Sequence, residues 1–130
     1  MGKTNPPAVV LDAGALIAFE RADPRMRALG REAIRGGVRL IVPAGVVGQV
    51  LRDRVRQVPL RALLGSAATT VPPLTRALAE AAGALCGRAG TSDVIDASVV
   101  LVARRECAPV ITSDVGDLRR LDPKLELERI

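Results

Sequence analysis

Short apolar runs alternate along the chain with longer segments in which apolar residues recur at helical spacing. The short runs are rich in valine and isoleucine, which is typical of buried strands, and the periodic segments are typical of helices packed on a sheet. The predicted strands cover residues 8–11, 38–42, 69–71 and 109–112, with 125–127 as a possible edge strand.

Capping and helix-breaking residues bound the segments between these strands. Asp23 and Pro24, for example, supply an N-cap and a proline at the first position of a helix that ends at Gly36 and Gly37. The predicted helices cover residues 13–20, 24–35, 43–56, 59–64, 73 to 87 or 90, 94–103 and 115–121. Strands that alternate with helices predict an α/β fold whose mainly parallel sheet carries helices on both faces.

The 130 residues contain no repeat, linker or low-complexity tract, so we predict a single domain over residues 1–130. The longest apolar run, residues 99–103, is too short to cross a bilayer, and the first residues lack the apolar core of a signal peptide. Cys86 and Cys107 form no CxxC pair, and we expect both to be buried in a reducing compartment. These features predict a cytoplasmic protein with no membrane partner.

The composition narrows the chemistry that this chain can perform. Histidine, tryptophan and tyrosine are absent, and Phe19 is the only aromatic residue. Without histidine there is no imidazole base and no histidine-held zinc ion. Without aromatic side chains there is no platform on which nucleic-acid bases stack. Carboxylates, hydroxyls, arginine, backbone groups and a bound metal remain.

The formal net charge of +5 is unevenly distributed. Residues 21–61 contain ten arginines and three acids, a net charge of +7, whereas residues 91–130 contain eight acids and six bases, a net charge of −2. A basic region permits binding to a polyanion such as nucleic acid. The alternative is that the arginines only solvate helix surfaces, and the charge alone does not decide between the two.

Aspartates stand at the ends of predicted strands and at the starts of predicted helices. Asp12 and Asp114 each follow a strand, Asp93 and Asp96 lie three residues apart at the start of a helix, and Asp117 lies three residues beyond Asp114. In a parallel sheet these groups lie at the carboxyl edge, where ligands bind. Clustered carboxylates need a compensating cation or shared protons, and hard cations such as Mg²⁺ and Mn²⁺ prefer oxygen ligands. Such a metal supports phosphodiester cleavage without histidine.

Each aspartate also has a purely structural interpretation. Asp12 and Asp93 can cap the helices that follow them, and Asp96 can be a first-turn acid favoured by the helix dipole. Asp114 and Asp117 can be turn residues. Asp96 fits this interpretation least well, because it lies in a run that is otherwise almost wholly apolar, where an unpaired charge is costly.

Four stretches of the chain, in their order and spacing, resemble the PIN-domain family, and in particular the VapC-like toxins of bacterial toxin–antitoxin pairs. The stretches are Val9–Ile17, Ile41–Val50, Asp93–Ser98 and Val110–Leu118. The resemblance implies a three-layer α/β/α sandwich and a Mg²⁺- or Mn²⁺-dependent endoribonuclease. It also implies that Asp12, Asp93 and Asp114 hold the metal, with Asp96 and Asp117 as supporting acids.

The same resemblance implies partners. VapC-like toxins usually form homodimers and are inhibited by a cognate VapB-like antitoxin that inserts a segment into the active-site groove. The basic residues 21–61 would then contact the backbone of the RNA substrate, and residues 43–65 would form a clamp or a dimer arm.

One position departs from the family pattern. The family typically carries a glutamate where this chain has Gln49, and an amide oxygen can coordinate a metal but adds no charge. Asp53, one helical turn further on, can compensate in part, or it can form an ion pair with Arg52 or Arg56.

Three functions follow from these features. The first is a metal-dependent ribonuclease toxin, and the second is a PIN-like RNA-binding module with weak or no nuclease activity because of Gln49. A phosphoacceptor receiver domain is disfavoured, because a single Asp12 follows the first strand and the only lysines are Lys3 and Lys124.

Overall fold

The computed structural model describes residues 6–53 and 55–130. Five strands in these residues form one sheet in the order β3-β2-β1-β4-β5, and every neighbouring pair is parallel. The strands are β1 (Ala8–Leu11), β2 (Arg39–Ile41), β3 (Thr69–Thr70), β4 (Val110–Thr112) and β5 (Leu127–Arg129). The predicted parallel α/β fold is confirmed.

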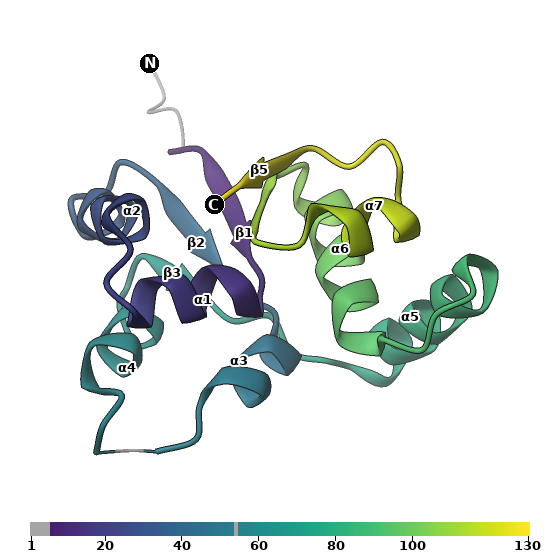
Figure 1. The fold of residues 1–130 in the computed structure, drawn as a ribbon, viewed down its shortest axis with the longest axis horizontal. Coiled ribbons are helices and arrows are strands. Elements are labelled where there is room, and N and C mark those ends of the chain that lie inside the picture. The colour runs from purple at the N-terminus through teal and green to yellow at the C-terminus, as the bar shows by residue number, and fades with distance from the viewer. Residues whose placement is uncertain (1–5, 54) are drawn as a thin grey trace.

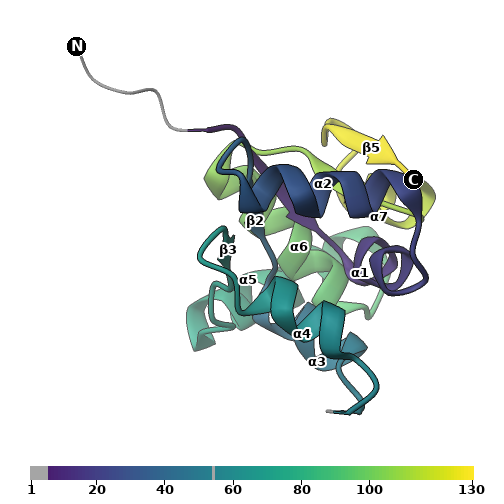
Figure 2. The same cartoon turned by 90° about the vertical axis from the view of Figure 1, so that its left-hand side faces the viewer.

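Helices cover both faces of this sheet. They are α1 (Ala13–Glu20), α2 (Pro24–Ile34), α3 (Ala44–Val50), α4 (Val58–Leu64), α5 (Arg76–Ala89), α6 (Val94–Glu106) and α7 (Val115–Leu121). Figure 1 shows α1, α2 and α4 on one side of β1, and α5, α6 and α7 on the other. Figure 2, turned by 90°, shows α2 and α4 in front of the strands and α5 and α6 behind them. The three layers make an α/β/α sandwich.

The central strands and α6 are buried because nearly all their side chains are apolar. Val10 and Leu11 of β1 are fully buried, as are Val99, Val100 and Val102 of α6. Helix α6 contacts β1, α5 and α7, so it has packing partners on most of its circumference. This placement explains why its sequence lacks a polar face and why a charged residue within it is unusual.

Three predicted boundaries are wrong. Helix α3 ends at Val50 rather than near residue 56, because Leu51 is extended and the chain then turns. Helix α5 begins at Arg76 rather than at residue 73, because the Thr75 side chain accepts a hydrogen bond from the Leu78 amide and is the better N-cap. The last strand lies at residues 127–129 rather than 125–127, where it pairs with β4.

Two further sequence predictions concern the burial of the two cysteines and the absence of a membrane-spanning segment. Cys86 is buried as expected, but Cys107 is exposed at the left-handed C-terminal end of α6, so the prediction for Cys107 is wrong. None of the helices among the described residues combines the length and apolar character that crossing a membrane requires.

An ion pair joins the end of α6 to the end of α7. Arg104 Nε donates to Asp122 Oδ2 over 2.9 Å, and the Asp122 side chain is only 13% exposed. Burial by itself raises the pKa of Asp122, but the hydrogen bond and charge of Arg104, with help from Lys124, hold it below the ordinary value of 3.8. The ionised carboxylate therefore stabilises the folded chain.

We predict that Asp122→Asn lowers the free energy of unfolding at pH 7 by about 0.5–1 kcal/mol. Because the pKa of Asp122 is lower in the folded state, the wild-type advantage is present above pH 3.8 and is lost as the pH falls through the folded-state value. Urea unfolding of wild type and variant at pH 7 and at about pH 3 measures the loss of stability and its dependence on pH. Glu80→Gln, which breaks the exposed pair with Arg76, is the control and costs less. An equal loss at both pH values would contradict the prediction.

Candidate active site at the carboxyl edge of the sheet

Asp12 lies where β1 ends and α1 begins. Its Oδ1 accepts a hydrogen bond from the Ala15 amide over 2.9 Å, so the side chain caps α1. The residue is only 6% exposed. Burial raises the pKa of Asp12, hydrogen bonds from Thr112 and the Ala15 amide lower it, and the negative charge of Asp114 raises it again. The net shift is upward.

Asp93 and Asp114 occupy the same position on two other helices. Asp93 Oδ1 accepts from the Asp96 amide over 2.9 Å at the start of α6, and Asp114 Oδ1 accepts from the Asp117 amide over 3.2 Å at the start of α7. The capping interpretation of Asp12 and Asp93 is therefore correct, and Asp114 is also a cap. A cap bond uses one carboxylate oxygen, so capping leaves the second oxygen for another role.

Asp12, Asp96 and Asp117 each have a pKa raised in part by another aspartate of this edge, so the five carboxyl groups lie within electrostatic reach of their neighbours. Burial is the largest cause that raises the pKa of Asp96, to about 7, and the charge and hydrogen bond of Asp93 and the charges of Asp12 and Asp117 add to it. The hydrogen bond and charge of Asp114 raise the pKa of Asp117, and Arg120 opposes the shift. The cluster thus contains two carboxyl pairs, Asp93 with Asp96 and Asp114 with Asp117.

An open groove runs past this cluster between α6 and α7, with a volume of about 650 Å³. Residues from both helices line it: Thr91, Ser92, Asp93, Val94, Ile95, Asp96, Asp117, Arg120 and Leu121. Asp12 and Asp114 are not among the lining residues. A ligand in the groove therefore meets Asp93, Asp96 and Asp117 first.

Thr112 is a residue of this region that the sequence interpretation missed. It is fully buried at the end of β4, its Oγ1 accepts a hydrogen bond from the Asp114 amide over 2.8 Å, and its hydroxyl also hydrogen-bonds to Asp12. Thr112 therefore fixes two of the candidate carboxylates relative to each other. A hydroxyl residue at the end of an otherwise apolar strand, two residues before an aspartate, was the signal available in the sequence.

Gly14 explains how β4 comes so close to the start of α1. A Cβ atom at position 14 would collide with the Ser113 side chain and lie 3.3 Å from the Ser113 backbone nitrogen. The loop that carries Asp114 can therefore pack directly on the first turn of α1, next to Asp12. Gly14, two residues after Asp12, therefore helps to bring Asp12 and Asp114 close together.

Gln49 lies on the exposed surface of α3. Gly45, one turn earlier on the same face, packs so closely against Ile95 that a Cβ atom there would collide with it. The face of α3 that carries Gln49 is therefore the one that approaches the start of α6, next to Asp96. Asp53 lies beyond the end of α3 and interacts with Arg56, with 3.7 Å between Oδ2 and Nε. Of the two predicted roles for Asp53, the structure supports the ion pair.

The donor set fits a hard divalent cation in chemistry, because it consists of carboxylates. Burial together with neighbouring aspartates raises the pKa of Asp12 and Asp96, and Asp114 raises that of Asp117, so a cation would offset the cost of ionising them. Within residues 6–53 and 55–130, no three acidic or cysteine side chains are grouped closely enough to complete a coordination shell.

Comparisons with known proteins agree with this fold and site. A family model described as the PIN domain matches residues 9–123, and the chain therefore belongs to the PIN-domain family. No curated protein matches the sequence significantly. The expectation of PIN-family membership from the four sequence stretches is confirmed.

Three solved structures have a fold similar to that of this chain. VapBC2 from Rickettsia felis, bound to a DNA fragment from its promoter, contains a chain that matches with a TM-score of 0.69 and 15% identity, over 95% of this chain and 98% of that one. FitAB bound to an IR36 DNA fragment matches with a TM-score of 0.60 and 16% identity, over 93% and 94%. FitAcB from Neisseria gonorrhoeae matches with a TM-score of 0.59 and 16% identity, over 92% of this chain and 95% of that one. At these identities the likeness shows the fold.

We predict that the stability of the metal-free protein falls as the pH rises towards 7. The pKa of Asp96 is about 7 in the folded state against 3.8 ordinarily, so its contribution is fully present below pH 3.8 and is lost as the pH rises through about 7. Asp96→Asn should flatten this dependence, and Glu80→Gln, which removes an exposed carboxylate of α5, should leave it as in wild type. Urea unfolding between pH 5 and 8 measures the slopes. Identical slopes for wild type and Asp96→Asn would contradict the prediction.

Proposed function

We propose that this protein is the toxin of a toxin–antitoxin pair and acts as a Mg²⁺- or Mn²⁺-dependent endoribonuclease that hydrolyses RNA phosphodiester bonds. The observation that carries the proposal is the group of five aspartates that the starts of α1, α6 and α7 hold at the carboxyl edge of a PIN-family sheet. In a chain without histidine, these are the residues able to support hydrolysis through a metal.

Asp12, Asp93 and Asp114 are the proposed metal ligands. Each presents one oxygen to a helix amide, which fixes its orientation and leaves the other oxygen for a cation. A divalent cation bound there supplies polarisation of the phosphate and activation of the attacking water. Asp96 and Asp117 are supporting acids, and the raised pKa of Asp96, about 7, allows it to hold or release a proton near neutral pH.

The proposed partners follow from the same family. The similar structures VapBC2 and FitAB are complexes of the toxin–antitoxin kind, which supports a VapB-like antitoxin as the partner of this chain. An RNA substrate, assembly as a homodimer and a cytoplasmic location remain parts of the proposal. The arginine-rich residues 21–61 offer positive charge for the RNA backbone.

A second candidate function is RNA binding with weak or no cleavage. The observation that favours it is Gln49, an amide on the face of α3 that approaches the start of α6, where the family typically carries a glutamate. Asp53 does not replace that charge, because its carboxylate interacts with Arg56 and with two amides of its own turn.

We predict that purified protein with Mn²⁺ cleaves single-stranded RNA and that Asp12→Asn reduces the rate on the order of 100-fold or more. Asparagine keeps the helix cap, so this variant removes charge with little loss of structure. Mn²⁺ should also raise the melting temperature of wild type and not that of Asp12→Asn, while Glu80→Gln behaves as wild type. If wild type cuts no RNA with any divalent metal and shows no Mn²⁺-dependent stabilisation, the proposed function is wrong.

We predict that Gln49→Glu increases both Mn²⁺ affinity and the cleavage rate, on the order of tenfold. The reason is that a carboxylate adds the negative charge that the amide lacks, and an exposed position accepts it without repacking. Titration with Mn²⁺ followed by thermal melting measures the affinity, and a time course of RNA cleavage measures the rate. Gln49→Ala is the matched control. If Gln49→Glu leaves both quantities at the wild-type value, position 49 does not contribute to the metal site.

A further inference from the structure

The arginines of residues 21–61 are not equivalent in the fold. Arg27 stacks over Phe19, 4.5 Å from the ring centre, and its Nε donates to the Phe19 carbonyl. Arg35 pairs with Glu32, and Arg56 pairs with Asp53. These three side chains already have partners within the chain. Their positive charge is therefore less available to a ligand than that of an arginine without such a partner.

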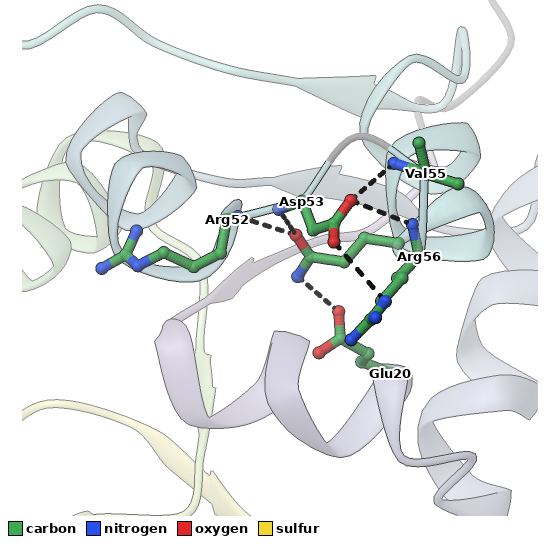
Figure 3. Close-up of polar contacts among 6 residues, drawn as sticks. Glu20, Arg52, Asp53, Val55 and Arg56 are labelled. Atoms are coloured by element: carbon green, nitrogen blue, oxygen red, sulfur yellow. Dashed lines mark hydrogen bonds and ion pairs between the residues drawn. The ribbon is translucent and has the colours of Figure 1, made fainter.

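Arg52 and Arg61 line an open groove of about 460 Å³ between α3 and α4, together with Leu51, Asp53 and Leu64. Among the described residues, no carboxylate lies within ion-pair distance of Arg52 or Arg61. The one acid in the groove wall, Asp53, is engaged elsewhere. Its Oδ1 accepts from the amides of Val55 and Arg56, and its Oδ2 faces Arg56, as Figure 3 shows. The groove therefore keeps a net positive charge.

The guanidinium of Arg52 is held in place rather than free in solvent. Its Nη1 donates to the carbonyls of Gly48 and Leu51, over 2.6 and 3.0 Å, at the C-terminal end of α3. Carbonyls at a helix C-terminus attract a cation, so this position suits an arginine. An arginine has five N–H donors, so donors remain for a ligand. In Figure 3 the Arg52 side chain points away from the turn that Asp53 forms with Val55 and Arg56.

Gln57 holds the chain between α3 and α4 in this shape. Its side chain is 8% exposed and its amide group makes four hydrogen bonds. Nε2 donates to Glu20 Oε2 over 2.6 Å and to the Val50 carbonyl over 2.8 Å. Oε1 accepts from the amides of Arg52 and Asp53, over 2.7 and 2.9 Å. Every hydrogen-bonding position of the amide is used, and the end of α1 is tied to the groove.

Helix α3 connects this groove to the candidate active site. Its first turn packs on Ile95 through Gly45, beside Asp96, and Arg52 follows directly after its C-terminal end, where its guanidinium donates to the Gly48 carbonyl. Seven helical residues span about 10 Å, so the end of α3 beside α6 and the end beside the groove lie about that far apart. A single-stranded polyanion that passes through the active site can reach both.

We propose that the α3–α4 groove is a phosphate-binding subsite for the backbone of single-stranded RNA, with Arg52 and Arg61 as its ligands and Gln57 as the positioning residue that maintains it. The identity of the polyanion rests on the proposed function. The existence of the groove, its positive charge and the Gln57 hydrogen bonds do not depend on that function.

Binding of RNA to an Asp12→Asn background tests the subsite without cleavage. The probe is a fluorescently labelled single-stranded RNA oligonucleotide of mixed sequence, titrated at several salt concentrations. Arg61→Gln and Arg52→Gln should each raise Kd on the order of fivefold. Each should also lower the slope of log affinity against log salt by about 0.7. The control is Arg76→Gln, an exposed arginine of α5 that pairs with Glu80, and it should change neither quantity.

The role of Gln57 has its own variant pair. Gln57→Glu has the same shape but places a carboxylate against Glu20, so the groove should open and Kd should rise as in Arg61→Gln. Adding Glu20→Gln restores a donor opposite position 57 and should recover part of the affinity. A residue that only stabilises the fold would show no such recovery in the salt slope. Circular dichroism and thermal melting confirm that each variant is folded.

The outcomes separate the subsite from the proposed function. If wild type cleaves RNA but Arg52→Gln and Arg61→Gln bind as tightly as Arg76→Gln, the subsite is wrong and the function stands. If no cleavage occurs but RNA binding weakens as predicted, the subsite stands and the ribonuclease proposal fails. Arg61→Gln is the decisive variant if Arg52→Gln does not fold, because Arg61 is exposed and makes no cap bond.

Discussion

Repulsion between carboxylates at one edge of the sheet is the constraint that the rest of this structure must accommodate. The pKa values of Asp12, Asp96 and Asp117 are all raised: burial is the main cause at Asp12 and Asp96, where neighbouring aspartates add to it, and Asp114 is the main cause at Asp117. The fold offsets this by placing Asp12, Asp93 and Asp114 at the starts of helices, where amides and the positive end of the helix dipole favour negative charge. Capping and candidate catalysis are therefore two uses of the same side chains. Substitution by alanine removes both, whereas substitution by asparagine keeps the cap.

The sequence predicted most of this edge because short-range rules govern it. An aspartate directly after an apolar strand in a parallel fold must emerge at the carboxyl edge, and this placed Asp12 and Asp114. Asp96 was the carboxylate that least fitted a purely structural role. Its pKa is raised to about 7, mainly because burial at the start of α6 disfavours the charged form and the charge of Asp93 adds to the effect. What the residue pattern could not distinguish was cap from ligand, since both need an aspartate at the same place.

The features that the sequence did not predict depend on buried polar side chains that join nearby backbone amides and carbonyls to a distant segment. The end of α3 was misplaced because Gln57, a polar residue in an arginine-rich stretch, has no local signature of the four hydrogen bonds it makes to Glu20, Val50, Arg52 and Asp53. Thr112 was read as one more strand residue, although its hydroxyl links Asp12 and Asp114. In both cases a buried polar group has a partner that is far away in the sequence, Glu20 for Gln57 and Asp12 for Thr112, so the local sequence does not reveal it.

Helix α3 gives the net charge of +5 a spatial meaning. Its first turn lies against the acidic edge through Gly45, and Arg52 follows its C-terminal end beside the basic groove. Uniformly distributed charge would attract RNA without orienting it, whereas opposite charges at the two ends of a short rigid helix define a direction for a bound strand. Gln49 lies between these ends. In the proposed mechanism, a neutral residue at this position lowers the negative charge that an approaching phosphate meets and weakens the binding of the cation, so position 49 would balance substrate attraction against metal affinity.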